Sequence, residues 1–190
     1  MADLPPPSPP PLPQLPVIYI AGRGMRVFCA LLDFTIILLL TSFLVSKVFW
    51  PQMYPDAWPA LLEWNEEVAA TYPNYSEPPE AAKEGVGFAQ AVCAMVAWIY
   101  FYASETITRG SSLGKSVFGL RVISLKRGTY PHPLEIGVRA SVKSTCFLLP
   151  FPLLFISLFL LLLHRQRRSA HDLLAHTIVI AGPPLLIKPK

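Results

Sequence analysis

The chain has 190 residues and a formal net charge of +4, and 53% of its residues are hydrophobic whereas only 15% are charged. Ordinary soluble domains contain about 25% charged residues, so this composition excludes a typical soluble protein and favours a membrane protein of one domain. The net charge must therefore be interpreted by its position relative to the membrane, and we expect no nucleic-acid partner.

Residues 1–22 are expected to form a disordered cytoplasmic tail. The stretch from 5 to 16 reads PPPSPPPLPQLP, and proline fixes φ and removes backbone donors. A flexible spacer is the simplest interpretation of this tail. The alternative is that the polyproline segment docks to an SH3-like partner.

The first predicted membrane span covers residues 27–46, in which Asp33 is the only charged residue. As a helix, this stretch is long enough to cross a hydrocarbon core of roughly 30 Å. Arg26 stands at its entrance, and Asp33 follows seven residues later on nearly the same helical face. A carboxylate at that depth costs on the order of 2.5–3.5 kcal/mol unless it finds a partner or water.

The role of Asp33 has two interpretations. It forms a buried ion pair that fixes helix packing, or it carries protons or cations through the membrane. Arg26 lies roughly 10 Å away along the same helix, so a direct pair between them is strained. We therefore expect a partner from another helix, Arg109, or else a bound proton or cation. The polar residues expected to gather near the cytoplasmic boundary are Arg26, Asp33, Glu105, Arg109 and Asp172.

Residues 50–86 are predicted to form an acidic loop outside the cytoplasm. The loop contains seven acidic residues and one basic residue, Lys83. Its prolines leave room for one short helix, over Ala60–Thr71, and its interleaved tryptophans and tyrosines suit lipid headgroups. The spacing of its residues assigns the loop no ligand.

The second predicted span covers residues 87–106. Small residues recur at every fourth position in Ala89, Cys93 and Ala97, which permits close helix packing. At its end, Glu105 and Arg109 are four residues apart with the acid first, which predicts an ion pair on one helical face.

The loop over residues 107–144 is basic, with seven lysines and arginines against one acid, Glu135. The contrast with the acidic loop places the N-terminus and the basic loop in the cytoplasm. Within it, Gly110–Ser116 (GSSLGKS) has three residues between its glycines, where a nucleotide-binding P-loop has four, so it predicts a tight basic turn. Gly119–Leu125 and the later Thr177–Ala181 are rich in β-branched residues and predict two short strands.

The third apolar segment, residues 145–163, contains Pro150 and Pro152, which disfavour one straight helix. One straight span would also place the arginines that follow it outside the cytoplasm, against the charge rule. The alternative is a hairpin, with one helix over Leu134–Leu149 and a second over Phe151–His164. Both alternatives remain open at this stage.

The segment after residue 163 is polar. Arg165, Arg167 and Arg168 either bind anionic lipid headgroups or only set the topology. His171, Asp172 and His176 could make a metal site, but the two histidines are not on one helical face, so a wet interface is the favoured interpretation.

These residues resemble the RDD family of membrane proteins, which is named for one arginine and two aspartates. In that family the arginine opens the first span and the first aspartate lies within it, matching Arg26 and Asp33. The second aspartate lies in a C-terminal basic segment, matching Asp172 in RRSAHDLLAHTIVI. The family's GxxxGKxxxGLRV stretch is present as GSSLGKSVFGLRV, from Gly110 to Val122.

The resemblance covers residues 23–180, and residues 50–86 depart from it because many relatives have a shorter first loop. It implies transport of an unidentified ligand, and some members resemble sodium/proton antiporters. A eukaryotic relative resembles an adaptor in a membrane degradation complex. The resemblance therefore leaves two functional classes open.

We expect an all-α integral membrane fold: a small helical bundle of two full spans, a third broken, re-entrant or spanning apolar segment, and a small cytosolic β element. The membrane domain covers residues 23–182 and is followed by a tail over 183–190. It is expected in a bacterial cytoplasmic (inner or plasma) membrane, with the N-terminus in the cytoplasm.

Two functions follow from these expectations. One is transport of a small solute or cation, in the manner of Na⁺/H⁺ exchange, with Asp33 as the intramembrane carboxylate. The other is a non-enzymatic scaffold or adaptor in a larger membrane complex. Besides the lipid bilayer, we expect a homo-oligomer or a larger complex as the partner. We expect no catalytic residue, cofactor or metal.

Overall fold

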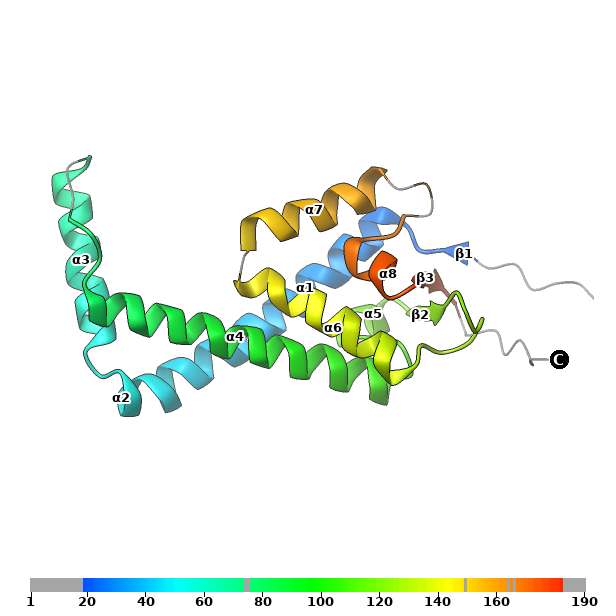
Figure 1. Cartoon of the computed structure of the whole chain (residues 1–190), viewed down its shortest axis with the longest axis horizontal. Coiled ribbons are helices and arrows are strands. Elements are labelled where there is room, and N and C mark those ends of the chain that lie inside the picture. The colour runs from blue at the N-terminus through cyan, green and yellow to red at the C-terminus, as the bar shows by residue number, and fades with distance from the viewer. Residues whose placement is uncertain (1–18, 74–75, 149, 164, 166, 183–190) are drawn as a thin grey trace, which may run out of the picture.

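The computed structural model describes residues 19–73, 76–148, 150–163, 165 and 167–182. The proline-rich stretch and the C-terminal tail over 183–190 lie outside the described residues. Most of the described chain is helical, with a small sheet at one end (Figure 1).

Among the described residues, two helices are long and apolar enough to cross a membrane: the continuous helix Arg23–Met53 and α4, Glu80–Ile107. The first comprises α1 (Arg23–Leu44), the π-helical segment η1 (Val45–Phe49) and α2 (Trp50–Met53). Both contain the predicted spans and extend beyond them. Pro51 is the second residue of α2, which directly follows the π-helical segment, and the helix continues past it to Met53.

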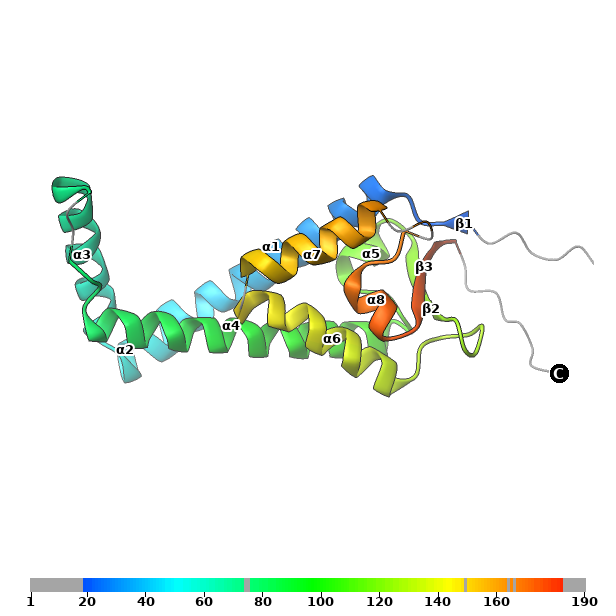
Figure 2. The same cartoon turned by 45° about the horizontal axis from the view of Figure 1, so that its top comes forward.

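Helix α3 (Ala57–Thr71) follows, three residues longer at its start than predicted. Pro59 lies in its first turn, a position where proline is tolerated. The helix packs against the start of α4, where Ala57 faces Gly85 so closely that a side chain at Gly85 would collide with it. It lies at the end of the molecule opposite the sheet (Figures 1 and 2).

The sheet has three antiparallel strands in the order β1-β3-β2. They are β1 (Tyr19–Ile20), β2 (Leu120–Ser124) and β3 (Thr177–Ala181). The two predicted strands therefore form and pair with each other, with Val122 opposite Val179. Strand β1 was not predicted, and it shows that the residues before the first span are not tail throughout.

The basic turn contains a short helix, α5 (Leu113–Val117), which leads into β2. Gly110 begins this turn with φ +95°, a conformation that L side chains rarely adopt. A side chain there would also meet the backbone oxygen of Val122 and the ring of Pro131. The glycine therefore holds the turn against the sheet.

The third apolar segment is divided between α6 (Pro133–Leu148) and α7 (Pro150–Leu163). The two helices run in opposite directions side by side (Figures 1 and 2). Residues 145–163 thus do not form one straight helix, and the arrangement is that of the hairpin. The reason is Pro150, which is tolerated at the first position of a helix but not in its interior.

Helix α8 (Ala170–Leu174) follows the hairpin and leads into β3. Between the long helices, a small apolar core joins Ile37 of α1, Ala97 and Phe101 of α4, and Ala140 of α6. A second core joins the sheet to the start of α1 through Ala21, Cys29, Leu120, Val122 and Val179.

Candidate functional site: a buried network of charged residues

Helix α1 turns one polar stripe toward the rest of the protein. Arg26 is 8% exposed and Asp33 is 3% exposed, whereas Leu31 between them is 55% exposed. The spacing of seven residues places both charged side chains on the buried face, as predicted. The two residues nevertheless belong to different sets of contacts.

Asp33 receives three hydrogen bonds from neutral donors. The hydroxyl groups of Tyr100 and Ser112 donate to it at 2.6 and 2.5 Å, and the backbone N–H of Gly114 donates at 2.8 Å. Ser112 and Gly114 belong to the start of α5, so Asp33 fixes this short helix against α1. Bonds to a carboxylate are stronger than neutral ones, which offsets part of the cost of burying it.

The predicted pair between Asp33 and Arg109 is wrong. Arg109 lies two residues after the last residue of α4 and has φ 56°. This left-handed conformation carries its side chain away from α4, and its guanidinium lies 6.0 Å from the centre of the Tyr130 ring. The predicted pair between Glu105 and Arg109 is absent from the described residues for the same reason.

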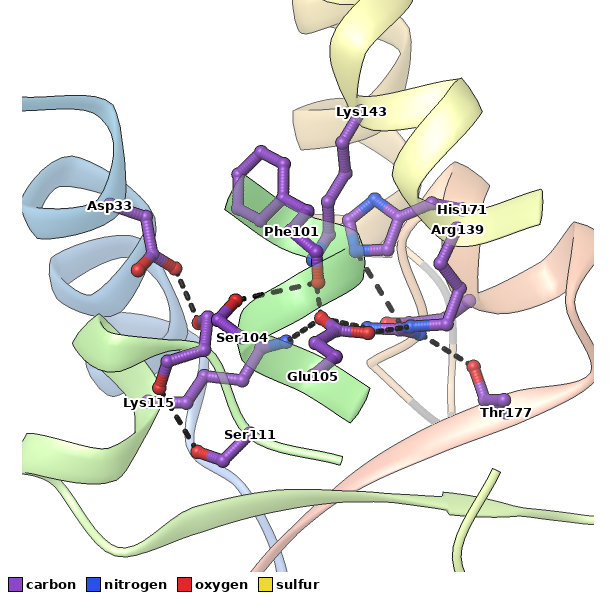
Figure 3. A network of polar contacts seen from close by, with 12 residues as sticks. Asp33, Phe101, Ser104, Glu105, Ser111, Lys115, Arg139, Lys143, His171 and Thr177 are labelled. Atoms are coloured by element: carbon purple, nitrogen blue, oxygen red, sulfur yellow. Dashed lines mark hydrogen bonds and ion pairs between the residues drawn. The ribbon is translucent and has the colours of Figure 1, made fainter. Parts of the chain in front are cut away.

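Glu105 is fully buried and binds three cations from two other helices. Lys115 Nζ of α5 lies 2.6 Å from its carboxylate, and Arg139 Nε and Lys143 Nζ of α6 lie at 2.9 and 2.6 Å (Figure 3). Lys143 also lies 4.2 Å above the centre of the Phe101 ring. One carboxylate therefore joins α4, α5 and α6.

Arg139 connects Glu105 to the second acid of the network. It is fully buried, and its Nη1 donates to the carboxylate of Asp172 and to the Thr177 hydroxyl, the latter at 2.6 Å. Its side chain thus reaches from the long helix α4 to α8 and strand β3. Truncating Arg139 removes one cation from each of two buried carboxylates, and removing one partner of a buried ion pair is strongly destabilising.

Asp172 ends the chain of contacts at α1. It forms an ion pair with Arg26, and with Ser169 it forms a capping box at the start of α8, in which the Ser169 backbone N–H donates to its carboxylate at 3.3 Å. The Ser169 hydroxyl also lies 2.8 Å from that carboxylate. Burial alone would raise the pKa of Asp172, but the surrounding positive charge, that of Arg139 first, holds that pKa well below its usual 3.8. Asp172 is therefore a stable anion.

His171 lies beside this pair and is neutral. Its side chain is 17% exposed, and its Nε2 lies 3.7 Å from the Asp172 carboxylate. Burial lowers the pKa of His171 well below 6.5, and the nearby cations, Lys143 first, lower it further although Asp172 opposes them.

The structure does not gather the three residues considered for a metal. His176 is exposed, with φ 51°. In the part of the chain that the structure describes, no group of three or more His, Cys, Asp or Glu residues is placed to hold a metal ion.

The three arginines after α7 differ in their surroundings. Arg168 donates to the backbone oxygens of Thr177 and Asp172, both at 3.1 Å, so it supports α8 and β3. The backbone oxygen of Arg167 accepts a hydrogen bond from Arg26. Arg165 is exposed. Of the three predicted lipid contacts, Arg165 is the one whose side chain is most open to a headgroup.

Sequence reasoning placed Arg26, Glu105 and Asp172 in one cluster, and the structure brings them together through Arg139. It missed Lys115, Arg139 and Lys143. One signal was present: Arg139 and Lys143 are four residues apart, so they share a helical face. A lone glutamate at the end of a span required cations from elsewhere, and this pair was available in the basic loop.

The sequence model of the RDD family matches residues 20–176, which include both aspartates, the arginine and all the cations of the network. No curated protein and no solved structure matches the chain significantly.

Proposed function

This chain belongs to the RDD family, and on that premise we propose that it is a non-enzymatic membrane scaffold. In this proposal two spans and the α6–α7 hairpin hold the small sheet in a fixed position at the membrane. The assembled face is then available to a larger membrane complex. The observation that carries the proposal is the position of Arg139 between Glu105 and Asp172.

The network supports a rigid frame because each of its charged side chains has a partner of opposite charge within the chain. Four cations, Arg26, Lys115, Arg139 and Lys143, bind two carboxylates, those of Glu105 and Asp172. These contacts join α1, α4, α5, α6 and α8, and Thr177 adds β3. A network that fixes five helices and a strand suits a structural role better than a function that requires these elements to move against one another.

The proposed orientation places the sheet and N-terminus in the cytoplasm of a bacterial cell and the α3 end outside it. The distribution of charge supports this choice. The basic residues gather near the sheet, whereas the exposed acids are in the segment of α3 and the start of α4.

Cation-coupled transport is the second candidate, and Asp33 is the observation in its favour. A carboxylate that is 3% exposed within a candidate span is a common mark of a proton or cation path. Its three donors argue against this role, since a transported ion would have to displace or share them.

Native mass spectrometry of the full chain, extracted in lipid nanodiscs, distinguishes the candidates. The scaffold proposal expects one copy of the chain bound to a larger complex, and loss of that complex in Arg139→Gln but not in the exposed control Arg109→Gln. The transport proposal expects a homo-oligomer that moves Na⁺ or protons in liposomes. A homo-oligomer whose flux is abolished by Asp33→Asn would overturn the scaffold proposal.

A further inference from the structure

Helix α3 occupies a distinctive position between the two candidate spans. It connects the end of the first, at Met53, to the start of α4 at Glu80, on the side opposite the sheet. Figures 1 and 2 both show α3 running steeply across the direction of α4. If α4 crosses the bilayer, a helix in this direction lies along the membrane surface.

The residues of α3 divide into three faces at 100° per residue. The first face packs against the start of α4 and comprises Ala57, Leu61, Trp64 and Val68, which are buried or half-buried. The second is apolar but open, with Trp58 51% and Leu62 46% exposed, four residues apart. The third comprises the exposed acids Glu63, Glu66 and Glu67.

The open apolar face begins at the depth where the first span ends. The ring of Trp58 lies 5.5 Å from that of Trp50, whose indole nitrogen donates to the backbone oxygen of Gly85 at 3.2 Å. Phe88 contacts both Phe49 and Tyr54 through their rings, at 5.6 and 5.2 Å. Tryptophan and tyrosine at the end of a span mark the interface between hydrocarbon and water.

We propose that α3 is an interfacial helix that lies on the outer surface of the bilayer. Trp58 and Leu62 enter the boundary between headgroups and acyl chains, and the three glutamates face water. The occupant of the open apolar face is therefore lipid, because that face is continuous with the aromatic residues at the ends of the spans. Anionic headgroups would be repelled by the glutamates, so the helix suits zwitterionic lipid.

Spin labels on two faces of α3 test this proposal. The full chain, with Cys29, Cys93 and Cys146 replaced by alanine, is labelled at Leu62→Cys or Glu66→Cys in phosphatidylcholine nanodiscs. We expect the label at 62 to collide mainly with oxygen and to lie roughly 5–10 Å below the headgroup boundary. The matched label at 66 should collide mainly with a water-soluble nickel chelate.

Two results would overturn the proposal. Equal access of the nickel chelate to both labels would mean that α3 stands in water. An immobile label at 62 that neither reagent reaches would mean that a protein, such as a second copy of the chain, covers this face.

A second measurement does not need the cysteine-free protein. In nanodiscs of lipid brominated near the headgroup, tryptophan fluorescence of the natural chain should be quenched more than that of Trp58→Phe. The control Trp64→Phe changes a half-buried residue of the packed face and should retain the quenching of the natural chain. Equal quenching in the natural chain and in Trp58→Phe would contradict the lipid contact.

Discussion

Arg26 forms an ion pair with Asp172, a residue 146 positions later in the chain. The contact joins the first turn of the long N-terminal helix to the capping box of α8. It connects the arginine and the second aspartate for which the family is named. The first aspartate, Asp33, instead fixes α5.

Replacing Arg139 should destabilise the protein more than any other single change in the network. Arg139→Leu leaves Glu105 with two lysines and leaves Asp172 with Arg26 alone, both inside the protein. Removing one partner of a buried ion pair costs about 3–5 kcal/mol. Thermal unfolding in detergent measures the loss, and the exposed control Arg109→Leu should stay within about 0.5 kcal/mol of the natural chain. Equal unfolding temperatures for the two variants would contradict the central place of Arg139.

Asp33 should tolerate asparagine better than alanine. In Asp33→Asn, the amide oxygen still accepts from Tyr100 and Gly114, and the amide nitrogen donates to Ser112, so the loss should be about 1–2 kcal/mol from weaker, uncharged bonds. In Asp33→Ala, the buried donors of Ser112 and Gly114 and the half-buried Tyr100 hydroxyl lose their acceptor, at about 1–3 kcal/mol for each unsatisfied buried group. Chemical unfolding in mixed micelles would measure both variants. Equal losses in the two variants would contradict this expectation, because they would mean that the charge, which both variants lack, makes the whole contribution.

Gly114 should resist substitution by alanine. A Cβ at this position would lie 2.9 Å from Asp33 Oδ1 and would also press on the backbone oxygen of Cys29, so α5 would have to move away from α1. We expect Gly114→Ala to lose about 1–3 kcal/mol, as overpacked sites do. Gly137→Ala is the matched control. A Cβ at this position would lie 3.9 Å from the nearest atom, on the Tyr102 ring, and alanine is more stable than glycine in a helix interior. The unfolding midpoint of this control should not fall.

Acid should destabilise the fold in two stages. The pKa of His171 lies well below 6.5 in the folded chain. As the pH falls below 6.5, the unfolded chain therefore binds a proton at this histidine while the folded chain does not. Stability is therefore full above pH 6.5 and falls below it, by roughly 1–2 kcal/mol by pH 5. The lowered pKa of Asp172 also makes stability fall with falling pH. This second loss of stability begins near pH 3.8 and continues below it.

Unfolding midpoints between about pH 8 and pH 2 check this dependence. His171→Gln should flatten the stage that begins near pH 6.5 and leave the more acidic stage in place. His176→Asn changes an exposed histidine with positive φ, which asparagine also adopts, and serves as the control. An unchanged slope in His171→Gln would show that another group produces the first stage.

The parts of the fold that depend on local pattern could be predicted from the sequence. The spans follow from uninterrupted apolar length, and β2 and β3 follow from short β-branched runs bounded by glycine. Pro150 indicated the break between α6 and α7. Strand β1 has only two residues, too few for any periodicity, and it exists because β3 presents an edge to it.

The candidate site was harder to predict because its contacts join distant residues. Arg139 is 34 positions from Glu105 and 33 from Asp172. A cation near the membrane can equally extend to the headgroups, so no local pattern placed the Arg139 side chain inside the protein. The predicted partner of Asp33 was an opposite charge, Arg109. The Asp33 carboxylate instead accepts hydrogen bonds from two hydroxyl groups and a backbone N–H.

The account rests on one buried chain of charges that ties the start of the first span to α8 and the sheet. A double-mutant cycle with Arg26→Gln, Asp172→Asn and the combined variant tests it directly, with unfolding free energy in mixed micelles as the measurement. We predict that the combined variant is less destabilised than the sum of the single variants, by about 1–3 kcal/mol. Additivity within about 0.5 kcal/mol would mean that the two residues do not act on each other, and would contradict the account.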